Sequence, residues 1–339
     1  MNAVLIIDKP PGLTSHDVVN RVRRILHERS VGHLGTLDPM ATGVLPLVTG
    51  SLTRLAQFYT ASEKTYEGAI RFGFATDTYD AEGEPTTTPQ SVHLRPVEIE
   101  SLAARFRGVI EQTPPPFSAK KIKGVPAYKL ARQQKEVVLK PVQVEIKEFE
   151  ILAVDLDRVR FRARVASGTY MRSVAHDMGR ELACGAHLES LRRTAVAEFT
   201  LADAHTLEEL ATHCHPDRSL SFPEGKASGV EGPAVDPGAP SFSRSSREGG
   251  DVDSAAELPK ATFESLEALF VHPRKLLPDF PCVTADEPTV ARIRSGRTIN
   301  LPELSRARQV KVFASQRDLI AIATRVAGTL FHPKIVLSI

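Results

Sequence analysis

The spacing of hydrophobic residues predicts alternating strands and helices in the first 200 residues. An unbroken apolar run over residues 3–7 predicts a buried strand that leaves into a proline–glycine turn. Hydrophobic positions at helical spacing follow over residues 14–28, and this segment begins with a threonine and a serine, both suited to cap a helix. A glycine-rich loop over residues 32–46 comes directly afterwards.

In the middle of the chain, hydrophobic residues recur with the spacing of strands in some segments and of helices in others, which is typical of an α+β protein. A strand followed by a polar loop is predicted over residues 64–85, and a helix that ends at a glycine is predicted over residues 96–108. Residues 158–165 alternate between arginine and apolar side chains, which predicts a strand with one buried face. Another helix is predicted over residues 171–185.

The last third of the chain changes character twice. Residues 216–257 are dense in Pro, Gly and Ser and show no periodicity, which predicts a disordered insert. Short alternating runs between residues 284 and 339 predict a small all-β module. We therefore expect a first domain over residues 1–281, which contains the insert, and a second domain over residues 282–339.

Composition and charge describe an ordinary globular chain, with 42% hydrophobic residues, 25% charged residues and a net charge of +2. The three cysteines lie far apart, which argues against a zinc site or a disulfide framework and suits a reducing compartment. The apolar run near the N-terminus is too short for a signal peptide or a membrane span, so we expect a cytoplasmic protein. The sequence has no phosphate-binding or dinucleotide-binding glycine motif.

Basic residues are concentrated in several separate elements. Residues 118–140 hold many lysines and arginines against a single acid, and arginines alternate along residues 158–164. Each run alone is most often a solvated face, but together they would bind phosphates if the fold brought them to one side. Aromatic residues make up only 6% of the chain and tryptophan is absent, so a folded RNA recognised by shape fits better than a single strand bound by stacking.

One carboxylate, that of Asp38, stands alone in the glycine-rich loop. Asp-Pro commonly begins a helix, and a helix cap would explain the pair without any chemistry. An aspartate in an apolar pocket can also act as a nucleophile or base, provided that a neighbouring cation keeps it ionised. Arg172 is a candidate for that cation, although by itself it could equally be a surface charge. Tyr66 and Tyr170 are the aromatic side chains in comparably structured settings.

Five blocks of the sequence together resemble the TruB-type tRNA pseudouridine synthases in order and spacing. The most specific block is the segment GTLDPMATG around Asp38, and the resemblance covers residues 1–212. The tail resembles, more weakly, the small RNA-binding domain of the PUA type found in that family. The five blocks are residues 5–26, 31–50, 64–83, 114–132 and 167–199.

The resemblance implies a fold and a reaction. The expected fold is α+β, with a catalytic domain built on a mixed, largely antiparallel sheet flanked by helices, and a small all-β PUA-like domain at the C-terminus. The expected reaction converts uridine to pseudouridine at the T-loop position known as 55 in tRNA, with the base flipped out of its stack. No cofactor and no metal is expected for an isomerisation. The implied partner is the T-arm of tRNA, bound by a monomer without an obligate protein partner.

The resemblance also implies roles for individual residues. Asp38 would be the catalytic aspartate, acting at the ribose C1′ or at C6 of the base, and both alternatives stay open. Tyr66 would stack on the base and help to remove the C5 proton, and Arg172 would pair with Asp38. The implied substrate-binding residues are the uridine-displacing His33, the base-contacting Tyr170, Leu191 at the uracil site, Asp80 as a resting partner of Arg172, and Lys9 and Arg54 as basic positions near the RNA.

Three departures and two alternatives accompany the resemblance. Phe117 stands where the family commonly has tyrosine, Ala166 stands where it often has cysteine, and the insert over residues 216–257 is not a usual feature. A non-catalytic tRNA-binding or tRNA-folding protein would need the basic elements but not Asp38. A T-loop methyltransferase would need a cofactor loop, which the sequence does not contain.

Overall fold

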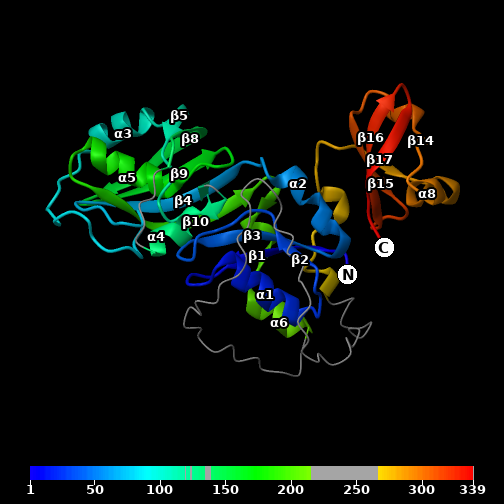
Figure 1. Cartoon of the computed structure of the whole chain (residues 1–339), viewed down its shortest axis with the longest axis horizontal. Coiled ribbons are helices and arrows are strands. Elements are labelled where there is room, and N and C mark those ends of the chain that lie inside the picture. The colour runs from blue at the N-terminus through cyan, green and yellow to red at the C-terminus, as the bar shows by residue number, and fades with distance from the viewer. Residues whose placement is uncertain (119, 123, 134–138, 215–265, 339) are drawn as a thin grey trace.

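The computed structural model describes residues 1–118, 120–122, 124–133, 139–214 and 266–338. The predicted insert over residues 216–257 lies outside the described residues. A large sheet forms the centre of the molecule, and a smaller sheet at the C-terminus forms a separate lobe beside it (Figure 1). The expected α+β class is therefore confirmed.

The large sheet has ten strands, with the order β12-β1-β3-β10-β4-β9-β8-β5, while β2 pairs with β3 and β11 with β10. β1 pairs with β12 and β3 with β10 in parallel, and the other pairs are antiparallel, as expected for a mixed, largely antiparallel sheet. The strands are β1 (Val4–Lys9), β2 (Val31–His33), β3 (Thr42–Thr49), β4 (Lys64–Phe72), β5 (Gly108–Gln112), β8 (Val142–Asp155), β9 (Arg158–Val165), β10 (Ala186–Val196), β11 (Phe199–Thr200) and β12 (Ala204–His205).

Helices cover the sheet at both ends. α1 and α6 lie side by side next to β1, α3 packs on β8 towards the other end of the sheet, and α5 packs on β10 and β4 (Figure 1). The helices are α1 (Ser15–Ile25), α2 (Ala56–Tyr59), α3 (Pro96–Ala104), α4 (Ala127–Arg132), α5 (Met171–Glu181), α6 (Leu207–Cys214) and α8 (Glu287–Arg294). Short 3-10 turns are η1 (Gly50–Leu55), η2 (Leu201–Asp203), η3 (Pro273–Lys275) and η4 (Pro302–Leu304), and β6 (Lys121–Ile122) and β7 (Val125–Pro126) form a small hairpin.

The start of α1 follows the predicted capping chemistry. The Thr14 hydroxyl accepts a hydrogen bond from the Asp17 amide at 3.1 Å, and the Asp17 carboxylate accepts one from the Thr14 amide at 2.9 Å. This reciprocal pair satisfies backbone donors that the first helical turn leaves free. The helix ends at Ile25, before the predicted residue 28, because His27 adopts a positive φ of 49°.

Strand β9 has the predicted alternation, but three of its four outward arginines are already paired. Val159, Phe161 and Val165 face the core, with at most 1% exposure. Arg158 pairs with Glu189 of β10 at 2.9 Å, and Arg162 pairs with Glu67 of β4 at 2.8 Å. Arg164 likewise bridges glutamates of the neighbouring segments. Glutamates thus neutralise most of this basic run, and the solvated-face interpretation holds for β9.

The C-terminal lobe is a five-stranded sheet with the order β13-β15-β16-β17-β14. It is not purely β, because α8 packs on it. Its strands are β13 (Cys282–Thr284), β14 (Ile299–Asn300), β15 (Gln309–Phe313), β16 (Leu319–Ala327) and β17 (Leu330–Val336). No helix among the described residues is long and apolar enough to span a membrane.

Candidate active site

The loop that carries Asp38 joins β2 to β3 and contains no helix. The Ala41 amide donates to the Asp38 carbonyl at 3.1 Å, so Asp38 begins a tight turn, and β3 follows at once. The helix-cap interpretation of Asp38 is therefore wrong. The buried Ser15 at the start of α1 holds the preceding residue, since its hydroxyl accepts from the Leu37 amide at 2.8 Å and donates to the Leu37 carbonyl at 3.1 Å.

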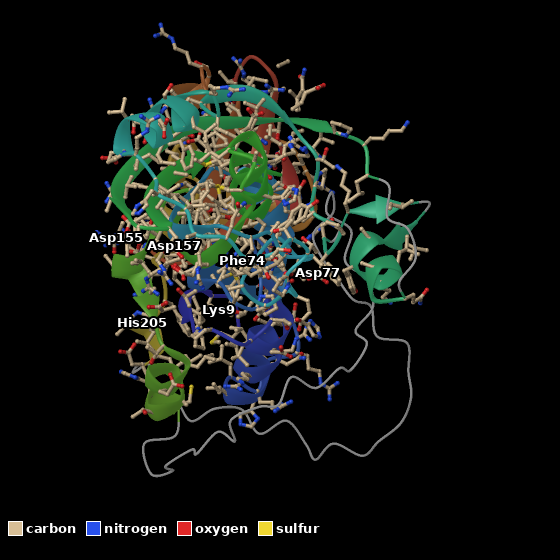
Figure 2. The ribbon with its side chains drawn as sticks, turned by 90° about the vertical axis from the view of Figure 1, so that its left-hand side faces the viewer. Lys9, Phe74, Asp77, Asp155, Asp157 and His205 are labelled. Atoms are coloured by element: carbon tan, nitrogen blue, oxygen red, sulfur yellow. The ribbon has the colours of Figure 1, made fainter. Side chains whose placement is uncertain are left out.

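Lys9 holds the same loop through hydrogen bonds from its ammonium group. Its ammonium donates to the carbonyls of Pro10, Leu13 and Pro39 at 2.7–3.0 Å, and the side chain has no exposed surface. Figure 2 shows Lys9 within the body of the domain. Burial lowers its pKa to about 8, against the opposing attraction of the Asp38 carboxylate. The expectation that Lys9 lies near the RNA stays a prediction, and its ammonium bonds to backbone carbonyls of this loop and of the turn after β1.

Arg172 lies between two carboxylates. Its Nη2 atom donates to Asp38 Oδ1 at 2.8 Å, and its Nη1 atom lies 3.5 Å from Asp80 Oδ2. The guanidinium also donates to the carbonyls of Thr78 at 3.3 Å and Phe117 at 3.1 Å. The Arg172 side chain is 6% exposed and that of Asp38 is 31% exposed, so a buried cation holds a carboxylate that still faces solvent.

The pairing compensates an unfavourable position of the guanidinium. Arg172 lies in the first turn of α5, where the helix dipole opposes a positive charge. Asp80 supplies a buried counter-charge and is itself held by the Thr78 hydroxyl at 2.6 Å and the Glu82 amide at 3.1 Å. Burial raises the pKa of Asp80, and the hydrogen bond from Thr78 and the charge of Arg172 act against that rise. These contacts fix the direction in which Arg172 points.

Tyr66 and Leu191 supply apolar surface on adjacent strands. Tyr66 of β4 pairs in register with Arg193 of β10, and Leu191 lies two residues earlier on β10. Tyr66 is 9% exposed and Leu191 is 7% exposed, and both belong to the main hydrophobic core. An aromatic ring and a leucine at the edge of the core are suited to hold a flipped base.

Tyr170 immediately precedes α5 and is fixed through its backbone. Its amide donates to Gln112 Oε1 at 2.8 Å, and Gln112 Nε2 donates back to its carbonyl at 3.1 Å. Burial, followed by the nearby charge of Asp38, raises the pKa of the Tyr170 phenol. The structure therefore brings Tyr170 near the Asp38–Arg172 pair.

His33 stands at the end of β2, just before the loop. Its Nδ1 atom accepts a hydrogen bond from the Gly35 amide at 3.3 Å, which assigns the proton of the neutral ring to Nε2. Burial, with the charges of Arg193 and His16, lowers its pKa to about 4. His33 is thus an uncharged ring at neutral pH.

Arg54 is not part of this cluster. It lies in η1, where its guanidinium donates to the Val336 carbonyl of β17 at 2.6 Å. The structure therefore places it at the junction with the C-terminal sheet.

Arg193 is a residue that the sequence analysis missed. Its side chain has no exposed surface, although it is a cation on a strand of the central sheet. The available signal was its position two residues after Leu191, which puts both side chains on the same inward face of β10. Phe117 also takes part, but through its carbonyl rather than through its ring.

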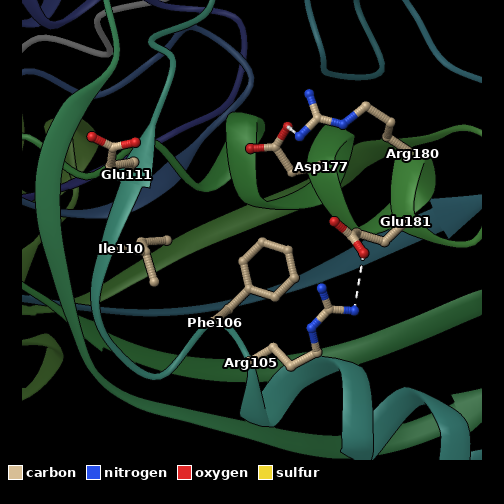
Figure 3. Close-up of a pocket in the computed structure, with 7 residues that line it drawn as sticks. All are labelled: Arg105, Phe106, Ile110, Glu111, Asp177, Arg180 and Glu181. Atoms are coloured by element: carbon tan, nitrogen blue, oxygen red, sulfur yellow. Dashed lines mark ion pairs between the residues drawn. The ribbon is translucent and has the colours of Figure 1, made fainter.

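A separate cavity of about 180 Å³ lies between α3, β5 and α5 (Figure 3). Phe106 and Ile110 line its apolar part. Four of its five charged side chains pair with one another, Arg105 with Glu181 at 2.9 Å and Arg180 with Asp177 at 3.1 Å. None of the predicted site residues lines it, so it does not belong to the candidate site.

Two family models match consecutive segments of the chain. Residues 23–171 match the N-terminal domain of the TruB family of pseudouridylate synthases, and residues 172–220 match the C-terminal domain of tRNA pseudouridylate synthase B. A protein of Solibacter usitatus named tRNA pseudouridine synthase B is 44% identical over 340 residues, covering 99% of this chain and 100% of that protein. One of the same name from Aquifex aeolicus is 43% identical over 219 residues, covering 64% of this chain and 76% of that protein.

Solved structures share the fold at lower identity. A chain of a Cbf5–Nop10–Gar1 complex has a TM-score of 0.62 at 23% identity, covering 96% of this chain and 79% of that chain. A chain of an H/ACA RNP bound to a substrate RNA containing 2′-deoxyuridine has a TM-score of 0.61 at 21% identity, covering 99% and 85%. The fold and the family models together define the class of the protein as a pseudouridine synthase, an isomerase. Within that class, the chain belongs to the TruB family.

Proposed function

We propose that this enzyme converts uridine to pseudouridine in the T-loop of tRNA, at position 55. The tRNA substrate is supported by the names of the relatives, and the position by the five sequence blocks that resemble the TruB type. The observation that carries the proposal is the 2.8 Å pair between buried Arg172 and partly exposed Asp38. Leu37 and Met171, which precede the two paired residues in the chain, belong to the same hydrophobic cluster as Tyr66 and Leu191. We also propose a cytoplasmic monomer.

Isomerisation breaks the bond between C1′ and N1 and forms a bond between C1′ and C5. Asp38 acts as the nucleophile, at C1′ or at C6 of the base, or assists glycosidic cleavage at C1′. Arg172 pairs with the carboxylate at 2.8 Å and fixes the direction in which the nucleophile points. The partly exposed side chain leaves Asp38 open to substrate, since only Oδ1 accepts from Arg172.

The other side chains receive and hold the base. The Tyr66 ring stacks on the flipped uracil and helps to remove the C5 proton, while N1 takes up a proton. Leu191 and Tyr170 complete the pocket, which offsets the cost of about a few kcal/mol for unstacking the base. The uncharged His33 ring displaces the uridine from the T-loop by its shape, since its lowered pKa of about 4 leaves no charge to contribute.

Replacing Asp38 with asparagine tests the assignment directly. Asp38→Asn keeps the size of the side chain and its contact with Arg172, so we expect a folded protein that binds tRNA but forms no pseudouridine. Release of tritium from tRNA labelled at C5 of uridine measures the reaction, and a transcript with cytidine at position 55 serves as the substrate control. Wild-type release by Asp38→Asn would overturn the role of Asp38, and unchanged release from the control transcript would overturn the position.

A further inference from the structure

Arg193 is a buried guanidinium that binds backbone on two different elements. Its Nε atom donates to the Val44 carbonyl of β3 at 2.8 Å. Its Nη1 and Nη2 atoms donate to the carbonyls of Thr36 at 3.1 Å and Gly35 at 3.0 Å, in the loop that leads to Asp38. The guanidinium donates from three separate nitrogens in a planar fork, whereas a lysine ammonium would donate all its bonds from a single atom.

The environment of Arg193 is unusual for a buried cation. Among the described residues, no carboxylate forms an ion pair with it, and its charge is balanced mainly by carbonyl dipoles. Burial lowers its pKa, while the hydrogen-bonded Tyr66 hydroxyl and the charge of Asp38 act in the opposite direction. The buried charge therefore acts on two groups that the proposed reaction uses.

Close packing of the backbone brings Arg193 to the loop. Arg193 pairs in parallel with Gly43, where a Cβ atom would lie 2.2 Å from the Arg193 carbonyl. Glycine at position 43 thus lets β3 approach β10. Lys9 holds Pro39 directly after Asp38, so Arg193 and Lys9 fix the backbone before and after the carboxylate.

We propose that Arg193 is a positioning residue that sets Asp38 against Tyr66. Through one guanidinium it connects the loop of Asp38 with the strand pair that carries Tyr66. The two groups act on opposite parts of the same nucleotide, at the glycosidic side and at C5, so their separation has to suit the substrate. This inference rests on the proposed function, because it assigns Arg193 to that reaction.

Arg193→Lys tests the inference, since it retains the charge but loses the fork. We expect the single-turnover rate of pseudouridine formation to fall about 100-fold, as for a misplacement of about 1 Å. The dissociation constant for tRNA should stay within about threefold of wild type, because Arg193 has no exposed surface to offer the RNA. Arg107→Lys is the matched control, as it removes a guanidinium bond to the Phe149 carbonyl at the far end of the sheet.

Gly35→Ala changes the same contact from the side of the loop. Gly35 has a φ of 153°, and a Cβ atom there would lie 3.7 Å from Arg193 Nη1, so the substitution strains the loop without crowding the core. We expect the same selective loss of rate. Gly108→Ala is its control, because Gly108 also has a positive φ, of 89°, with open space around it and a position at β5.

The outcomes separate this inference from the proposed function. Rates within threefold of wild type for both variants, or losses of rate matched by equal losses of tRNA affinity, would overturn the positioning role. Failure of both variants to fold would assign Arg193 to stability alone and would also overturn it. A wild-type enzyme that forms no pseudouridine at position 55 would overturn the proposed function instead.

Discussion

Asp38 and Arg172 are 134 residues apart in the chain, and 2.8 Å separates their charged groups. The contact holds Asp38 against a buried cation, and Asp80 fixes that cation from its other side. The resemblance to the TruB type pointed to Asp38, Arg172 and Asp80. It did not point to the carbonyls of Thr78 and Phe117, which accept the other hydrogen bonds of the Arg172 guanidinium. Backbone acceptors leave no trace in the identity of a side chain, so only the fold reveals them.

The lowered pKa of His33 predicts a loss of stability in acid. The unfolded chain takes up a proton near the ordinary value of 6.5, whereas the folded chain resists protonation down to about 4. Folding stability should therefore fall as the pH decreases from 6.5 to 4, by at most about 3 kcal/mol for this group and less after solvent screening.

Thermal unfolding of His33→Gln across this range measures the effect. The variant should show a flatter dependence than wild type, while the exposed His332→Gln should follow wild type. Identical acid dependence in wild type and His33→Gln would contradict the interpretation.

At the scale of elements, the start of α1 serves two purposes through neighbouring residues. Thr14 caps the helix, and Ser15 bonds both polar groups of the Leu37 peptide. The sequence predicted a cap at Thr14 or Ser15 from their residue types. It did not predict that Ser15 would hold the loop that carries Asp38, because Leu37 lies 22 residues further along the chain.

Paired substitutions at α1 separate helix stability from loop support. Ser15→Ala leaves buried groups of Leu37 unsatisfied and should cost about 1–3 kcal/mol, with a clear fall in the single-turnover rate. Thr14→Ala removes only the cap and should cost about 1 kcal/mol without changing the rate. Urea unfolding and rapid quench on the same preparations measure both quantities, and equal rates for the two variants would refute the distinction.

At the scale of the whole molecule, the C-terminal lobe shares a hydrophobic core with the large sheet. Leu52 and Leu55 pack in one cluster with Leu276, Phe313 and Ile335. A buried polar contact joins the same region, where the Tyr59 hydroxyl donates to Glu198 at 2.6 Å and the Leu277 amide donates to Glu198 at 2.9 Å. The boundary expected at residues 281 and 282 stays a prediction, although β13 begins at Cys282.

Tyr59→Phe should weaken this junction without affecting the chemistry. Burial and the Glu198 charge raise the pKa of Tyr59, so its hydroxyl stays a donor at neutral pH. Losing that donor should cost about 1–2 kcal/mol of stability and reduce tRNA affinity, because the orientation of the C-terminal sheet becomes looser. The rate at saturating tRNA should not change. A fall in that rate as large as the fall in affinity would contradict this prediction.

The sequence by itself determined the features that depend on neighbours in the chain. These features are the cap of α1, the alternation of β9 and the identity of the GTLDPMATG block. Each depends on residue types a few positions apart, and the periods of helix and strand are the same in every fold. The tertiary structure determined which charged side chains are paired and which are buried. Glutamates of neighbouring segments neutralise three of the four outward arginines of β9, and burial turns Lys9 and Arg193 into supports of the Asp38 loop. The physical reason is that electrostatic energy depends on distance and burial, and both are set only when distant strands come together.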